Sequence, residues 1–197
     1  MNDLELTNKI KEMVANCSFL VKRDILVEEL AELLEVINSP RLYISKWSNE
    51  KVLEEFADVY LCTWQMCLYL GEDNIEQYVS NYENINDYQY KRVEWTFLQK
   101  ATHAIWTVSK MRRESYSNKN VKNYTEFRAA IFLLADHLQT NMNNLKSTQC
   151  NEVIAEIRKI IEYKVERQLE RIAAEKKDIC EFCKEEENGS YIVEESK

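Results

Sequence analysis

Apolar residues recur at helical spacing along most of the chain. In one stretch they fall three or four positions apart, at Leu26, Leu30, Leu33, Leu34 and Ile37. The same period predicts helices over residues 4–38 (with a break near 16–18), 50–70, 73–85, 89–115, 121–145 and 149–182. The dipeptide Ser39-Pro40 ends the first of these helices, and Gly71 suits the position that follows a helix C-terminus. The pattern predicts an all-α protein folded as a helical bundle.

Composition supports this fold class and sets the expected domain organisation. The chain has 197 residues but only Gly 2 and Pro 1, so it lacks the turn residues that hairpins and βαβ units require. We expect a single all-α domain over residues 1–183, with repeat-like halves of about 1–88 and 89–183, and an acidic flexible tail over residues 184–197.

Charge and hydropathy narrow the classes of function. The net charge of −8 disfavours a nucleic-acid-binding role, for which the basic segment 110–122 is the main support. No apolar run reaches the about 18 residues of a membrane span, and the first residues lack the apolar core of a signal peptide. We therefore expect a cytoplasmic protein with no membrane partner.

The two halves of the chain are weakly similar to each other. A shift of 71 residues aligns ILVEELAELLEV (25–36) with TFLQKATHAIWT (96–107) and EFADVYL (55–61) with EFRAAIF (126–132). The apolar positions agree, but Glu29, Glu32 and Asp58 align with Lys100, His103 and Ala129. This predicts two degenerate tandem repeats of one helical unit, of which only the first keeps its acids.

Four carboxylates lie where two predicted helices border the core. With about 100° per residue, Glu29 borders the apolar stripe of its helix and Glu32 lies just beyond it. On the next helix Glu55 falls inside the apolar arc, and Asp58 lies one turn further on. Burying an ionised carboxylate without a partner is costly, so these positions require an explanation.

A divalent cation would explain these acids. The connector between the two helices permits antiparallel packing, which would bring the pairs face to face, and Mg²⁺ (or Mn²⁺) takes oxygen ligands of this kind. The alternative is that the acids are solvated or form pairs with lysines along the helix, as many helix acids do.

The acidic motif resembles that of a known family. Glu28-Glu29-Leu30-Ala31-Glu32, followed after about twenty residues by Glu55-Phe56-Ala57-Asp58, is similar to the EExxE…ExxD signature of the all-α nucleoside triphosphate pyrophosphohydrolases. That superfamily includes MazG-like enzymes, dimeric-type dUTPases and dCTP pyrophosphatases. The resemblance covers residues 22–70, about a quarter of the chain.

The resemblance implies Mg²⁺-dependent hydrolysis of a (d)NTP to the monophosphate and pyrophosphate. It implies that Glu29, Glu32, Glu55 and Asp58 hold the metal. We expect Glu28 or Glu32 to orient or deprotonate the attacking water. It also implies a homodimer or a monomer with two fused repeats. The longer motifs of a true dUTPase are not evident after the second helix, so uracil specificity does not follow.

Residues that contact the nucleotide are expected on several elements. The family often uses a lysine and an arginine on the helix after the acidic pair, which fits Lys164 and Arg167, and Lys51 lies one turn before Glu55. Other basic candidates are Lys22, Lys91, Arg92 and Arg171. Trp47, in the connector, is the candidate for stacking on a base. For each of these the alternative is an ordinary surface or packing residue.

Two further readings stay open. The chain can be a helical nucleotide-binding or protein-interaction module that keeps the fold without turnover, because the second half already lacks the acids.

Cys180 and Cys183 have the spacing of metal ligands, but no second ligand pair follows them, so an exposed pair in the tail is the alternative. His103 and His137 lie among apolar neighbours, which is typical of structural histidines.

Overall fold

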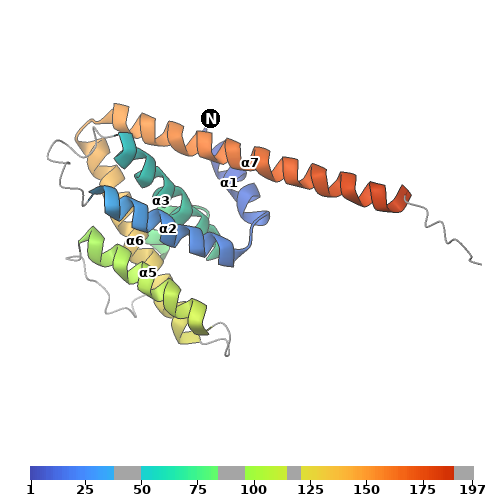
Figure 1. Cartoon of the computed structure of the whole chain (residues 1–197). Helices are drawn as coiled ribbons and strands as arrows, with labels where there is room; N and C mark the ends of the chain where they lie inside the picture. Colours follow the sequence, from blue (N-terminus) through green and yellow to red (C-terminus); the bar gives the residue numbers. More distant parts are fainter. Residues whose placement is uncertain (38–49, 84–95, 115–120, 189–197) are drawn as a thin grey trace, which may run out of the picture.

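A computed structural model of the chain describes residues 1–37, 50–83, 96–114 and 121–188, and their side chains except those of 111–114, 121–124 and 177–188. Within these residues the protein contains seven α-helices and no strand (Figure 1). The helices are α1 (Asp3–Ala15), α2 (Phe19–Ile37), α3 (Glu50–Tyr69), α4 (Ile75–Glu83), α5 (Phe97–Glu114), α6 (Val121–Ser147) and α7 (Asn151–Asn188). The prediction of an all-α bundle is confirmed.

Helix boundaries follow local chemistry. The predicted break near residues 16–18 separates α1 from α2. Gly71 has a φ of 94°, and the amides of Gly71 and Glu72 donate to the carbonyls of Leu68 and Cys67 at 3.1 and 3.0 Å. These two bonds form a Schellman motif, which satisfies the last carbonyls of α3. Gly71 therefore ends α3 as the sequence predicted.

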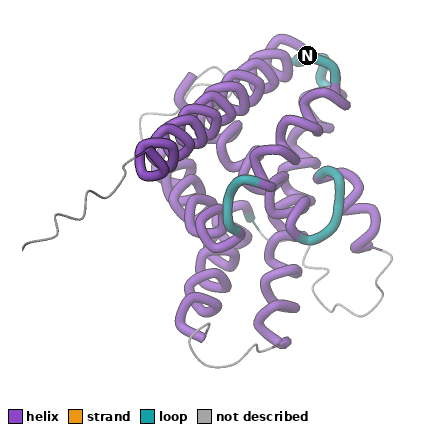
Figure 2. The backbone as a smooth tube through the Cα atoms, turned by 90° about the vertical axis from the view of Figure 1, so that its right-hand side faces the viewer, coloured by secondary structure: helices purple, strands orange, loops and turns teal. Residues whose placement is uncertain are grey.

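The core lies between α2, α3 and the helices that cover them. Helices α2 and α3 pack along each other, α7 crosses α1 and α3, and α5 and α6 form a second pair (Figures 1 and 2). Fully buried apolar side chains come from all seven described helices and include Ile10, Leu26, Met66, Leu134 and Ile157. Because α7 lies over α3, residues distant in sequence meet on one side of the α2–α3 pair.

Helix α7 is the longest element and extends past the bundle. It has 38 residues, and its C-terminal part projects away from the other helices in Figure 1. It continues to Asn188, so residues 184–188, assigned to the tail from sequence, are helical. The rest of the predicted tail, residues 189–197, lies outside the described residues.

When the sequences of α2 and α3 are shifted by 71 residues, they align with those of α5 and α6. Each of the two pairs packs side by side, as a tandem repeat would require. None of the described helices combines the length and the hydrophobicity that a membrane span requires.

Candidate functional site

The acids of α2 and α3 face each other in a regular order. Glu29 interacts electrostatically with Asp58, and the side chains of Glu32 and Glu55 share a hydrogen bond. As the residue number rises on α2, its partner on α3 falls, so the two helices run antiparallel. The two acid pairs predicted from sequence therefore meet across this interface.

Three of the carboxylates form a compact group, which we call the acidic cluster: Glu29, Glu32 and Glu55. One oxygen of each lies within 4.8 Å of the others. Glu55 is buried, Glu29 is half-buried and Glu32 is exposed. This spacing suits oxygen ligands around one hard cation, since each carboxylate needs to move little to contact the same ion.

Burial and repulsion by neighbouring acids raise the pKa of two carboxyls of the cluster, Glu29 and Glu55. The pKa of Glu29 is raised to about 7, first by burial and then by the negative charges of Asp58 and Glu32. The pKa of Glu55 is also raised, by burial and then by Glu32 and Asp58. The ionised cluster is thus held in an environment that opposes its charge, and a bound cation would relieve this opposition.

Asp58 differs from the other three acids because it has a cationic partner. The Lys164 ammonium of α7 donates a hydrogen bond to Asp58 and forms an ion pair with it. The pKa of Asp58 is nevertheless raised, because burial outweighs the opposing effect of Lys164. Lys164 therefore ties α7 to the edge of the acidic cluster.

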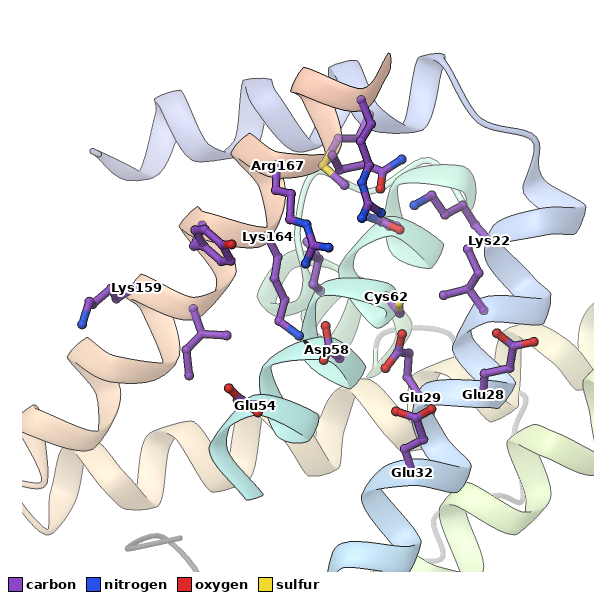
Figure 3. Close-up of a pocket in the computed structure, with 18 of the residues that line it drawn as sticks. Lys22, Glu28, Glu29, Glu32, Glu54, Asp58, Cys62, Lys159, Lys164 and Arg167 are labelled. Atoms are coloured by element: carbon purple, nitrogen blue, oxygen red, sulfur yellow. Dashed lines mark hydrogen bonds and ion pairs between the residues drawn. The ribbon is translucent and has the colours of Figure 1, made fainter. Parts of the chain in front are cut away.

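A cavity of about 740 Å³ opens beside these residues. Figure 3 shows acids of α2 and α3 on one side, with Lys164 and Arg167 of α7 pointing in from the other. Arg167 and Arg171, which also line it, form no ion pair within the described part of the chain. One wall is anionic and the opposite wall cationic, an arrangement that fits a phosphate ligand bound through a metal.

Most sequence-predicted site residues meet at this cavity. Its lining includes Glu28, Glu29, Glu32, Asp58, Lys164 and Arg167. Glu55 belongs to the acidic cluster without lining the cavity. Lys51 lowers the pKa of Glu55 by its charge but does not line the cavity either. Trp47, Lys91 and Arg92 lie outside the described residues.

Several polar residues of the cavity lining, Gln65 and Lys159 among them, were not singled out from sequence. Gln65 lies on the buried face of α3, two turns after Asp58, and Lys159 lies on α7. The signal for Gln65 was present, because a buried helix face rarely carries an amide without a partner. Lys159 gave no such signal, since its exposed side chain pairs with Glu156.

The second helix pair shows how the same positions look without a cluster. Glu126, which aligns with Glu55, pairs with Lys110 at 2.8 Å, and Lys100, which aligns with Glu29, pairs with Asp136 at 3.3 Å. Ala129, which aligns with Asp58, is buried. In α5 and α6 these charges are neutralised within the protein, whereas in α2 and α3 the carboxylates gather.

The remaining candidates lie elsewhere. His103 stacks on Trp106, and His137 stacks on Phe97 with ring centroids 5.1 Å apart, contacts typical of packing. Cys180 and Cys183 belong to α7, but their side chains lie outside the described part, as does most of the basic segment 110–122.

Comparison with known proteins gives this chain no relative: no protein-family model, no curated protein and no solved structure matches it.

Proposed function

We propose that the protein hydrolyses a nucleoside triphosphate to the monophosphate and pyrophosphate, with Mg²⁺ or Mn²⁺ as cofactor. The observation that supports this most is the meeting of two acid pairs beside a cavity with a cationic far wall. The donor set consists of carboxylate oxygens alone, which suits a hard divalent cation.

Glu29, Glu32 and Glu55 hold the metal in this proposal. When bound, the ion neutralises phosphate charge and polarises the phosphoryl group. Lys164 and Arg167 bind phosphate oxygens from the α7 side and orient the triphosphate. Asp58 keeps the Lys164 ammonium next to the acidic cluster through their ion pair.

Glu28 accepts the proton from water. It lines the cavity next to Glu29 but is outside the acidic cluster, so it is a better candidate base than Glu32, which serves as a ligand. A new bond forms between the water oxygen and the α-phosphorus. The bond from the α-phosphorus to the bridging oxygen breaks, and its electron pair leaves with pyrophosphate.

A second function is favoured by the Asp58–Lys164 ion pair. This ion pair engages Asp58, one of the four expected metal ligands. A site with one ligand fewer can bind a nucleotide without hydrolysing it. Such a protein would bind nucleotides with Mg²⁺ and release no pyrophosphate.

A pyrophosphate-release screen over the common NTPs and dNTPs with Mg²⁺ or Mn²⁺ tests the proposal. We expect release from at least one nucleotide and its loss in Glu55→Gln. The matched control is Glu126→Gln, because Glu126 aligns with Glu55 but lies in the second helix pair and contacts Lys110. Equal activity in both variants would contradict the assignment, and binding without release would support the second function.

A further inference from the structure

The cavity continues past the acidic cluster into a second polar region. Lys22 precedes Glu29 by seven residues on α2, and Gln65 follows Asp58 by seven on α3. Because the two helices are antiparallel, the order that pairs Glu29 with Asp58 brings Lys22 opposite Gln65. Seven residues are two helical turns, so this region lies about 10 Å along the pair from the acids.

Both side chains are buried and lack a protein partner. Lys22 is 6% exposed and Gln65 is 1% exposed, and both line the cavity. Among the described residues no carboxylate lies within ion-pair distance of Lys22, which points into the cavity in Figure 3. Gln65 Oε1 has no hydrogen-bond donor in the described protein. A buried acceptor without a donor is costly, and a ligand that donates to Gln65 Oε1 while it accepts from the Lys22 ammonium would remove this cost.

Apolar side chains also line the cavity near Lys22 and Gln65. Ile25 lies about one turn after Lys22 on α2, Leu61 lies about one turn before Gln65 on α3, and Met13 of α1 lines the cavity too; we call these five residues the inner recess. A triphosphate needs several cations, and those are on α7, at Lys164, Arg167 and Arg171. One donor and one acceptor between apolar walls suit a flat heterocycle with a polar edge instead.

We infer that the inner recess binds the base of the nucleotide and selects bases in which a ring N–H adjoins a carbonyl, namely uracil, thymine and guanine. The base carbonyl accepts a hydrogen bond from the Lys22 ammonium, and the ring N–H donates to Gln65 Oε1. Adenine and cytosine offer an amino group beside an unprotonated ring nitrogen and fit less well. This inference rests on the proposed function, since it names the base end of the same ligand.

Isothermal titration calorimetry of nucleotide binding, in the presence of Mg²⁺, tests the inference. The probes are UTP with an α,β-imido bridge, its N3-methyl derivative and inorganic triphosphate. We expect the wild type to bind the parent nucleotide about tenfold more tightly than the N3-methyl form, the effect of one buried hydrogen bond left unmade. In Gln65→Met this preference falls to within about threefold, whereas Lys22→Met weakens the binding of both nucleotides alike, because both keep the base carbonyl. The affinity for inorganic triphosphate is unchanged in both variants.

Controls separate folding from recognition. Lys22→Met removes a charge that forms no ion pair in the described protein, so its melting temperature should not fall. Lys159→Met, a change of an exposed lysine on the cavity rim, should keep the full preference.

Four results would overturn the inference. Equal binding of parent and N3-methyl nucleotide shows that the base is not read here. Loss of inorganic triphosphate binding in Lys22→Met shows that the recess holds phosphate. No binding of either nucleotide or triphosphate removes the proposed function as well, whereas pyrophosphate release without base preference removes the base assignment alone.

Discussion

Lys164 of α7 forms an ion pair with Asp58 of α3, the acid that the sequence grouped with Glu29, Glu32 and Glu55. This contact joins the cationic wall of the cavity to its anionic wall. It also sets up a competition, because Asp58 cannot pair fully with Lys164 and a metal at the same time.

Removal of Lys164 should separate metal binding from catalysis. In Lys164→Met, Asp58 loses its competing partner, so Mg²⁺ affinity should rise about fivefold, the equivalent of about 1 kcal/mol for a partly exposed ion pair. Pyrophosphate release should fall, because the variant lacks a phosphate contact. Mg²⁺ titration calorimetry and the release assay measure the two effects. If affinity and activity both fell, the competition between Lys164 and the metal would be excluded.

Neutralising Glu55 should stabilise the metal-free protein while abolishing its response to Mg²⁺. Glu55→Gln removes one charge from a buried group whose pKa is already raised by burial and by its acidic neighbours. We expect a higher melting temperature in EDTA, no Mg²⁺-dependent shift, and at least about a 100-fold loss of turnover. Glu126→Gln breaks an ion pair instead, so its melting temperature should fall with the Mg²⁺ response intact. If Glu55→Gln had a lower melting temperature in EDTA than Glu126→Gln, repulsion among the carboxylates of the cluster would be contradicted.

The stability of the metal-free protein should decrease as pH rises from about 4.5 to about 7. The pKa of Glu29 is about 7 in the folded protein and 4.5 as an ordinary glutamate. In this range the folded state binds the proton more tightly than the unfolded state, so the stabilisation is complete below 4.5 and is lost as pH passes through 7. Glu55 and Asp58 shift in the same direction. Denaturant unfolding across pH measures this slope.

Saturating Mg²⁺ should flatten that slope, because a bound cation favours the ionised carboxylates. A slope that is the same with and without Mg²⁺ would show that the metal does not bind at these acids.

Two positions with positive φ should respond oppositely to substitution. Gly71 has a φ of 94° and a Cβ there would meet no atom within 4 Å, so Gly71→Ala tests backbone strain alone. We expect a loss of about 1 kcal/mol. Gln149, between α6 and α7, has a φ of 59°, and Gln149→Gly should raise stability by up to about 1 kcal/mol. Chemical denaturation of both variants checks the prediction, and a change of the same sign in both would contradict it.

Sequence periodicity predicted the helices well because the bundle buries one face of each, and Gly71 marked a real helix end. It also brought Glu29, Glu32 and Glu55 together correctly, since the phase of each helix fixes which side chains face the partner. It did not predict the Asp58–Lys164 pair, which depends on where α7 crosses α3. A helix wheel describes one helix and carries no information on a third helix 100 residues later. Gln65 could have been noticed as an amide on the apolar face of its helix, but its lack of a donor is visible only once its neighbours are known.

The division of the cavity between α2–α3 and α7 has a consequence for protein synthesis. The carboxylates lie between Glu29 and Asp58, while Lys164, Arg167 and Arg171 come more than 100 residues later and are translated after them. A growing chain therefore exposes its acids well before any phosphate-binding residue of α7 emerges. A fragment that ends before α7 would contain all the acids of the cluster. Of the cationic residues that line the described cavity, it would contain Lys22 alone. On the proposed function, nucleotide binding would therefore depend on translation of α7, and a chain that ends before it would lack the phosphate contacts of Lys164, Arg167 and Arg171.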